Sequence, residues 1–82
     1  MEKINRHYYE ICIGTGPKER SDDFWMCVCG IREPTIQEAE HFYAADVSRH
    51  GGRVLGVYPI DRKTAVACYD FENAACWPVF GL

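Results

Sequence analysis

The sequence predicts an α+β domain in which one helix packs on one face of a four-stranded, mostly antiparallel sheet, in the order β-β-α-β-β. Two observations predict this class. Residues 35–50 carry both a helix start signal and a helix stop signal, and the segments on either side are rich in β-branched and aromatic residues. The 82 residues contain no internal repeat or linker, so we expect one domain, residues 1–82, ending in an apolar C-terminal tail.

Two apolar segments around a polar loop predict the first hairpin. Residues 7–13 and 24–31 are the strands, and residues 14–23 between them contain two glycines and a proline. Alternate positions of the second strand form one face with Trp25, Cys27, Cys29 and Ile31 and another with Phe24, Met26 and Val28. Because neither face suits water, we expect the second face of the sheet to be covered by the C-terminal tail or by another chain.

The helix is predicted from its ends and from one apolar stripe. Thr35 and Glu38 have the spacing of a capping box, in which each side chain accepts a hydrogen bond from the backbone of the other. The stripe consists of Ile36, Ala39, Tyr43 and Val47. Gly51 follows the last turn and can adopt the left-handed conformation that ends a helix.

A second hairpin is expected after the helix. Residues 53–60 and 64–69 are its predicted strands, and residues 61–63 its turn. Residues 70–75 are expected to form a turn or a single helical turn. Residues 76–80 form the apolar tail, which can be at most an edge strand because Pro78 has no backbone N–H to donate.

Composition and charge narrow the classes of function. The hydrophobic fraction of 48% is that of a folded globule, and a net charge of −3 without a basic run disfavours direct nucleic-acid binding. The first residues do not resemble a signal peptide, and no apolar segment approaches the roughly 20 residues of a membrane helix. We therefore expect a cytoplasmic protein that does not interact with membranes.

Five cysteines suggest metal or thiol chemistry, but their spacing favours packing. Cys27 and Cys29 could bind zinc together with Cys68, Cys76 or a histidine. The chain has no C-x-x-C pair, and neighbouring side chains on one strand converge poorly on a single ion. We expect reduced thiols that fill the core, with no metal site and no cofactor, and we keep a small zinc- or thiol-dependent domain as an alternative.

A cysteine nucleophile would need a histidine base beside it. His50 falls on the apolar stripe in the last turn of the predicted helix, where a capping or packed role is expected. His41 lies on the opposite side and is expected to be solvated. We find no catalytic residues and expect that the protein is not an enzyme.

Carboxylates clustered in loops and one aromatic residue are the candidate partner-binding residues. Acidic loop residues can contact a basic surface on a partner, although they also serve solubility alone. Phe42 lies off the apolar stripe, where it either laps over the sheet edge or anchors a partner. The candidates are Glu19, Asp22, Asp23, Phe42, Asp70 and Glu72.

This small acidic chain resembles in shape the small proteins that phages and mobile elements use against host defence, the anti-CRISPR proteins among them. The resemblance lies in the capped helix at 35–50, the Gly51-Gly52 turn and the strand pair at 54–69. The resemblance implies a non-enzymatic inhibitor in the host cytosol. Such an inhibitor docks on a CRISPR-Cas-type effector complex and blocks its nucleic-acid or nuclease surface. A homodimeric structural subunit is a further alternative.

Overall fold

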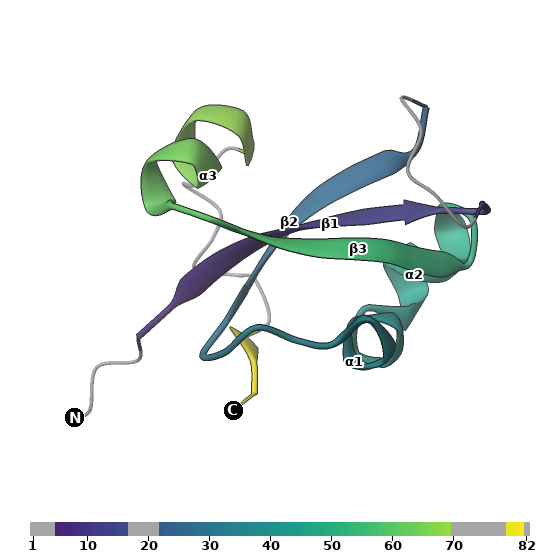
Figure 1. Cartoon of the computed structure of the whole chain (residues 1–82), viewed down its shortest axis with the longest axis horizontal. Helices are drawn as coiled ribbons and strands as arrows, with labels where there is room; N and C mark the ends of the chain where they lie inside the picture. The colour runs from purple at the N-terminus through teal and green to yellow at the C-terminus, as the bar shows by residue number, and fades with distance from the viewer. Residues whose placement is uncertain (1–4, 17–21, 70–78, 82) are drawn as a thin grey trace.

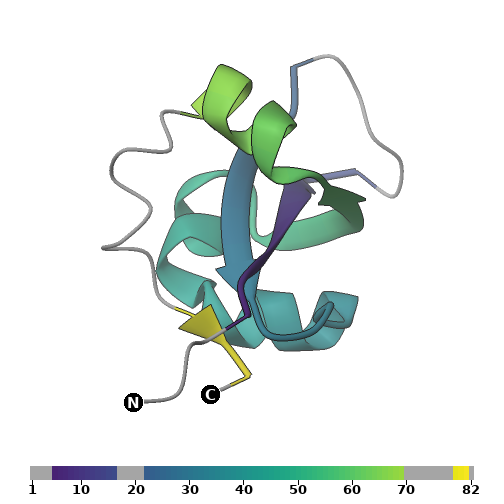
Figure 2. The ribbon, with the colours of Figure 1, turned by 90° about the vertical axis from the view of Figure 1, so that its left-hand side faces the viewer.

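The computed structural model describes residues 5–16, 22–69 and 79–81. Its elements are β1 (His7–Gly14), β2 (Phe24–Gly30), α1 (Ile36–Phe42), α2 (Ala44–Arg49), β3 (Arg53–Ile60), α3 (Arg62–Tyr69) and β4 (Val79–Phe80). The four strands form one sheet in the order β3-β1-β2-β4. Helices α1 and α2 lie on one face of the sheet and α3 on the other (Figures 1 and 2). The predicted α+β class and four-stranded sheet are confirmed.

β1 is the central strand and pairs antiparallel with both of its neighbours. Its register with β2 runs from His7 opposite Gly30 to Ile13 opposite Phe24, as the predicted hairpin requires. The ladder between β1 and β3 shifts after Cys12, leaving Leu55 as an extra residue in a bulge. Two antiparallel pairings therefore form most of the sheet.

The C-terminal tail adds the fourth strand of the sheet, at the edge position that was the most its sequence permitted. β4 consists of two residues at the edge of the sheet and pairs with Cys29 and Gly30 of β2. This pairing is parallel, so the sheet is mixed rather than wholly antiparallel. The turn predicted at 70–75 and the tail residues 76–78 lie outside the described residues.

The strand predicted at 64–69 is wrong, because this segment belongs to α3. Asp61 is the reason: its side-chain Oδ1 accepts from the backbone N–H of Thr64 at 2.7 Å, and its carbonyl accepts from Ala65 at 3.1 Å. These are the two bonds of a capped helix start. Ala65 is fully buried against the sheet, where its small side chain permits close packing. The expected turn at 61–63 is thus the cap and first residues of a helix.

The predicted helix at 35–50 is also two helices rather than one. Tyr43 separates α1 from α2 with backbone angles of φ −107° and ψ 33°. Its hydroxyl donates to the carbonyl of Cys29 at 3.4 Å, so the ring reaches across to β2. No glycine or proline marks the break, which leaves no local signal in the sequence. The stripe itself is confirmed at Ala39, Tyr43 and Val47, whereas Ile36 is 45% exposed.

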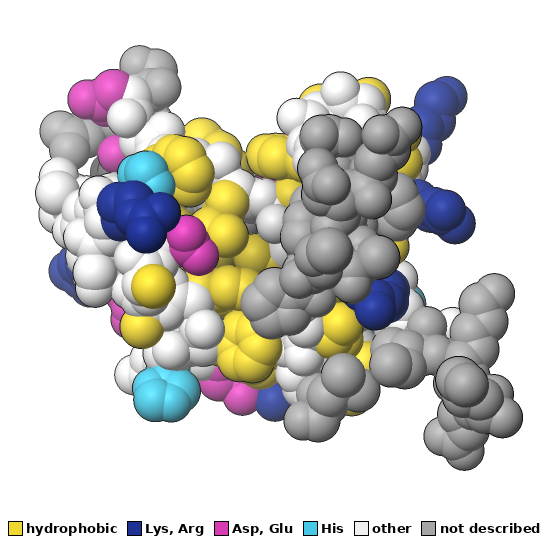
Figure 3. All heavy atoms as spheres, turned by 180° about the vertical axis from the view of Figure 1, so that it is seen from behind, with side chains coloured by type: hydrophobic (Ala, Val, Ile, Leu, Met, Phe, Trp, Pro, Cys, Tyr) yellow, Lys and Arg dark blue, Asp and Glu magenta, His cyan; other side chains and the backbone are white. Residues whose placement is uncertain are grey.

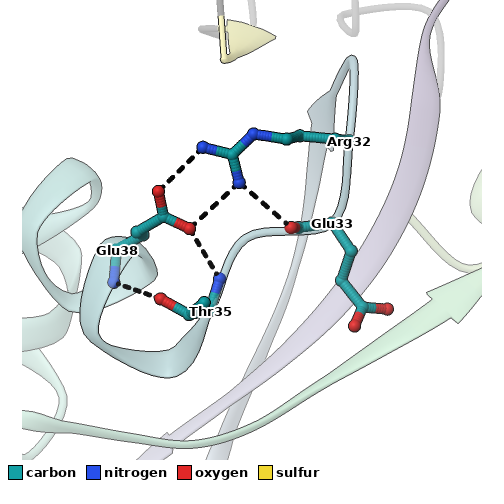
Figure 4. A network of polar contacts seen from close by, with 4 residues as sticks. All are labelled: Arg32, Glu33, Thr35 and Glu38. Carbon is teal, nitrogen blue, oxygen red and sulfur yellow. Dashed lines mark hydrogen bonds and ion pairs between the residues drawn. The ribbon is translucent and has the colours of Figure 1, made fainter.

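The predicted capping box is confirmed and is reinforced by an arginine (Figure 4). Thr35 Oγ1 accepts from the Glu38 N–H at 3.1 Å, and the Thr35 N–H donates to Glu38 Oε1 at 3.0 Å. Both guanidinium Nη atoms of Arg32 donate to the same carboxylate, at 3.0 and 2.8 Å. The hydrogen bond from Arg32, followed by that from Thr35, lowers the pKa of Glu38 to about 2. One exposed carboxylate therefore connects the β2–α1 loop to the helix start.

Gly51 ends α2 as predicted, and its position excludes a side chain. Its φ of 127° lies in the region that favours glycine, and the N–H of Gly52 then donates to the Val47 carbonyl at 2.8 Å. A Cβ on Gly51 would lie 2.7 Å from the backbone of Gly14. The helix end is therefore in direct backbone contact with the end of β1.

Two clusters of buried side chains form the core, one on each face of the sheet. The cluster beneath α1 and α2 contains Tyr9, Ile11, Ile13, Val28, Ala39, Tyr43, Val47 and Val54. The cluster beneath α3 contains Tyr8, Cys27, Cys29 and Ala65, with Ile60, Tyr69 and Val79 packed against it. The second face is therefore covered mainly by α3, with only Val79 contributed by the described tail.

None of the helices in the described part of the chain has the length and apolarity that a membrane crossing requires.

Replacing Gly51 by alanine should lower the free energy of unfolding by about 2 kcal/mol or more, because backbone strain and a backbone clash act together. Gly52→Ala is the matched control, because Gly52 also has a positive φ, of 89°, but open space around its Cα. It should cost about 1 kcal/mol. Urea unfolding of both variants measures the difference, and equal losses would contradict the close contact with Gly14.

Acid should remove the stabilisation that Glu38 provides. Because folding lowers the pKa of Glu38 from 4.5 to about 2, the stabilising effect is complete above about pH 4.5 and is lost as the pH falls towards 2. Unfolding free energies measured between pH 6 and pH 2 should show this loss. In Arg32→Gln the loss should be smaller, since the main cause of the shift is gone. Asp61, whose pKa is also lowered, by its hydrogen bonds with Thr64, contributes equally to both proteins. Superimposable acid profiles would contradict the role of the Arg32–Glu38 pair.

Candidate functional site

Apolar side chains remain exposed along β2 on the side of the sheet that faces α1 and α2. Phe24 at the start of β2 is 38% exposed, Phe42 at the end of α1 is 41% exposed, and Met26 between them is partly buried against the core. From behind the view of Figure 1, hydrophobic side chains form a continuous band across the surface (Figure 3). We call Phe24, Met26 and Phe42 the β2 band. Exposed aromatic side chains are enriched in surfaces that bind a protein.

Ring contacts hold both phenylalanines of the β2 band in place. The Phe24 ring stacks on His50 with centroids 3.6 Å apart and an interplanar angle of 3°. Phe42 makes edge-to-face contacts with Tyr43 and Phe80, at 4.8 and 5.4 Å. The packed role expected for His50 is therefore confirmed. Aromatic side chains fixed in this way lose little conformational entropy when a partner covers them.

A basic residue borders the β2 band at its β4 end. The Arg32 guanidinium lies 4.7 Å from the centroid of the buried Phe80 ring while it pairs with Glu38. The neighbouring Ile31 is 40% exposed and donates its N–H to the Phe80 carbonyl at 2.9 Å. This corner joins β4, the β2–α1 loop and α1 into one surface.

The three candidate partner-binding residues that the structure describes do not lie together. Asp22 is exposed and Asp23 half-buried just before β2, whereas Phe42 contacts Phe80 beside Gly30, at the other end of that strand. The Asp23 carboxylate lies against Gly14 and 4.0 Å from the Cys12 thiol. Glu19, Asp70 and Glu72 lie outside the described residues. Of the described acidic candidates, Asp22 is the exposed one, and it precedes Phe24 by two residues.

A second group of aromatic residues, not anticipated from the sequence, surrounds Glu10 on the α3 face of the sheet. The register places Tyr58 opposite Glu10 and Trp25 opposite Cys12, on either side of β1. The two ring centroids lie 5.8 Å apart with an interplanar angle of 34°; Trp25 is 36% exposed and Tyr58 is 39% exposed. The Tyr69 hydroxyl of α3 donates to Glu10 Oε2. We call Glu10, Trp25, Tyr58 and Tyr69 the Glu10 surface.

The environment of Tyr69 keeps its hydroxyl protonated. Burial first, and then the hydrogen bond to Glu10 and the charge of that carboxylate, raise the Tyr69 pKa far above its usual value of 10. Tyr69 therefore remains a hydrogen-bond donor to Glu10 at any physiological pH. No local pattern in the sequence indicated this surface, because its residues come from β1, β2, β3 and α3.

Burial makes Cys27 and Cys29 poorly suited to nucleophilic chemistry. Cys12, Cys27 and Cys29 are buried, as expected, and Cys68 is exposed on α3. Burial, followed by the Glu10 charge, raises the pKa of Cys27 to about 12, and burial also raises the pKa of Cys29. Across residues 5–16, 22–69 and 79–81, no three His, Cys, Asp or Glu side chains are arranged to hold a metal ion. Thiolate formation at Cys27 is thus strongly opposed by its surroundings.

The outer edge of β3 carries three features that oppose pairing with a strand from another molecule. Pro59 has no N–H to donate, Leu55 forms the bulge, and the Val54 N–H donates to Glu40 Oε2 at 3.0 Å. Proteins commonly use prolines, bulges and backbone groups that are already hydrogen-bonded to prevent an edge strand from pairing with another chain. Binding through side chains is therefore favoured over strand addition at this edge.

No family model, curated protein sequence or solved structure matches the chain. Its function must therefore be inferred from the two surfaces described above.

Iodoacetamide should label Cys68 in the native protein while Cys12, Cys27 and Cys29 stay protected, because the last three are buried and the pKa of Cys27 is raised. Mass spectrometry of proteolytic peptides reports each position separately. All four should react in 6 M guanidinium chloride, which controls for peptide recovery. Native labelling of Cys27 as fast as that of Cys68 would contradict its burial.

Proposed function

We propose that this protein acts without catalysis, by binding another protein through the β2 band. The observation that supports the proposal is the exposure of aromatic side chains that ring contacts already hold in place: Phe24 on His50, and Phe42 on Phe80 and Tyr43. Fixed aromatic anchors are the residues that most often dominate binding energy at protein interfaces. Their exposure would be costly in a protein that bound nothing.

The charges around the β2 band favour a partner with a basic surface. The chain has a net charge of −3, and the exposed Asp22 lies two residues before Phe24 in the chain. Charge complementarity of this kind increases association rates and selects among partners, whereas the aromatic anchors supply most of the affinity.

The most specific form of the proposal is a small inhibitor of a host defence complex of the CRISPR-Cas type. Such an effector presents basic surfaces to nucleic acid, and an acidic chain with an aromatic band can cover one of them in the host cytosol. Part of the resemblance in shape is lost, because residues 62–69 form α3 instead of a strand. The support that remains is the capped helix start, the acidic charge and the β2 band.

The zinc- or thiol-dependent alternative gains no support from the buried, protonated state of Cys27. The homodimer alternative uses the same β2 band, with a second copy of the chain as the partner. The two kinds of partner are separated by the experiment below.

Tagged protein should capture a defence effector from cells that carry a CRISPR-Cas-type system, and should reduce the effector's binding to its nucleic acid. The double variant Phe24→Ser/Phe42→Ser should weaken capture by about tenfold or more, equivalent to about 1.4 kcal/mol of lost binding energy. Val66→Ser is the matched control, because Val66 is 49% exposed on α3, which covers the opposite face of the sheet. It should bind like the wild type.

Light scattering over a range of concentrations completes the experiment. A monomer that captures the effector supports the inhibitor. A dimer that Phe42→Ser dissociates, without effector capture, would replace the inhibitor by the homodimeric subunit. Undiminished capture by the double variant would show that the β2 band is not the binding surface.

A further inference from the structure

The Glu10 surface holds a half-buried carboxylate at the centre of the sheet face that α3 covers in part. Glu10 lies on the central strand, with Cys27 and Tyr58 as its cross-strand neighbours and Trp25 on the diagonal. The Tyr69 hydroxyl binds its Oε2 from the α3 side. A carboxylate in such surroundings loses hydration, and an opposite charge compensates that loss best.

The ion pair formed among the described residues joins Arg32 to Glu38 and does not involve Glu10. Tyr69 is a neutral donor and engages one oxygen. The other oxygen, Oε1, accepts no hydrogen bond from the described residues. Among residues 5–16, 22–69 and 79–81, the Glu10 charge thus has no ion-pair partner, and Oε1 is left as an acceptor.

Two exposed aromatic rings complete the site. The ring centroids of Trp25 and Tyr58 lie 5.8 Å apart on the sheet face that carries Glu10, and each residue is more than a third exposed. The faces of tryptophan and tyrosine rings attract cations, and the attraction increases where water is partly excluded. The Tyr58 ring lies against Gly56, opposite Cys12, so the two rings lie next to Glu10 on the same face of the sheet.

The same combination occurs elsewhere in this molecule with its cation in place. The Arg32 guanidinium lies over the Phe80 ring at 4.7 Å and binds the Glu38 carboxylate through two nitrogens. There, a planar guanidinium satisfies a ring face and a carboxylate at once. The Glu10 surface offers these two elements without an arginine of the described chain between them.

We propose that the Glu10 surface binds an arginine side chain of a partner protein, whose guanidinium stacks on Trp25 or Tyr58 and donates to Glu10 Oε1. Arginine is favoured over lysine because its planar group can stack and form a directed hydrogen bond together, whereas an ammonium group cannot stack. The inference goes beyond the proposed function: this site lies on the opposite face of the sheet from α1 and α2, and it stands even if the β2 band binds nothing.

The test is a titration of the full-length, ¹⁵N-labelled protein with N-acetyl-arginine-N-methylamide, followed by NMR at constant ionic strength. The Trp25 indole signal and the Glu10 and Tyr58 amides should shift saturably. N-acetyl-lysine-N-methylamide should bind more weakly, by about threefold or more. Glu10→Gln, which keeps an oxygen for Tyr69, should weaken the arginine probe by about fivefold or more.

Two further variants keep the outcome decisive. Trp25→Leu should also weaken the arginine probe, and a dispersed spectrum shows whether this variant is folded. Phe42→Ser should bind the probe like the wild type, which separates this site from the β2 band. Equal affinity of wild type and Glu10→Gln, or equal affinity for the arginine and lysine probes, would overturn the proposal.

Discussion

The constraint on which the rest of the structure depends is that β1 must be covered on both faces. Ile11, Cys12 and Ile13 are consecutive, so they point alternately to opposite faces, and all three are fully buried. A strand of this kind needs a layer on each side, as well as a strand at each edge. In 82 residues, the chain meets the need with α1 and α2 on one face and α3 on the other.

Small helices cover a sheet incompletely, and the exposed aromatic residues lie where that cover ends. α3 packs over Tyr8, Cys27 and Cys29, and beyond it Trp25 and Tyr58 remain accessible. On the other face the β2 band runs along the side of β2 that the helices do not fully bury. Both candidate surfaces are thus consequences of a three-layer arrangement built from short elements. Small cysteine side chains permit the close packing between the layers.

Short-range polar interactions set the ends of these elements. The capping box of Thr35 and Glu38, the Asp61 cap of α3 and the bond from the Val54 N–H to Glu40 each satisfy backbone groups that would otherwise be left open. Glu10 differs from these carboxylates, because its hydrogen bond within the described residues comes from the Tyr69 hydroxyl and not from a backbone group or an arginine.

The sequence by itself determined the first hairpin, the Thr35 helix start, the Gly51 stop and the apolar character of both strand faces, because these depend on residues a few positions apart. Asp61 supplies a local cap for α3, but the β-branched and aromatic residues after it favour a strand, and the packing of Ala65 and Tyr69 on the second sheet face decided for the helix. The tertiary structure also decided the break at Tyr43, whose ring reaches β2, and the parallel pairing of β4. The Glu10 surface could not be predicted because its hydrogen bond joins Tyr69 to a residue 59 positions away, and no local pattern encodes such a contact.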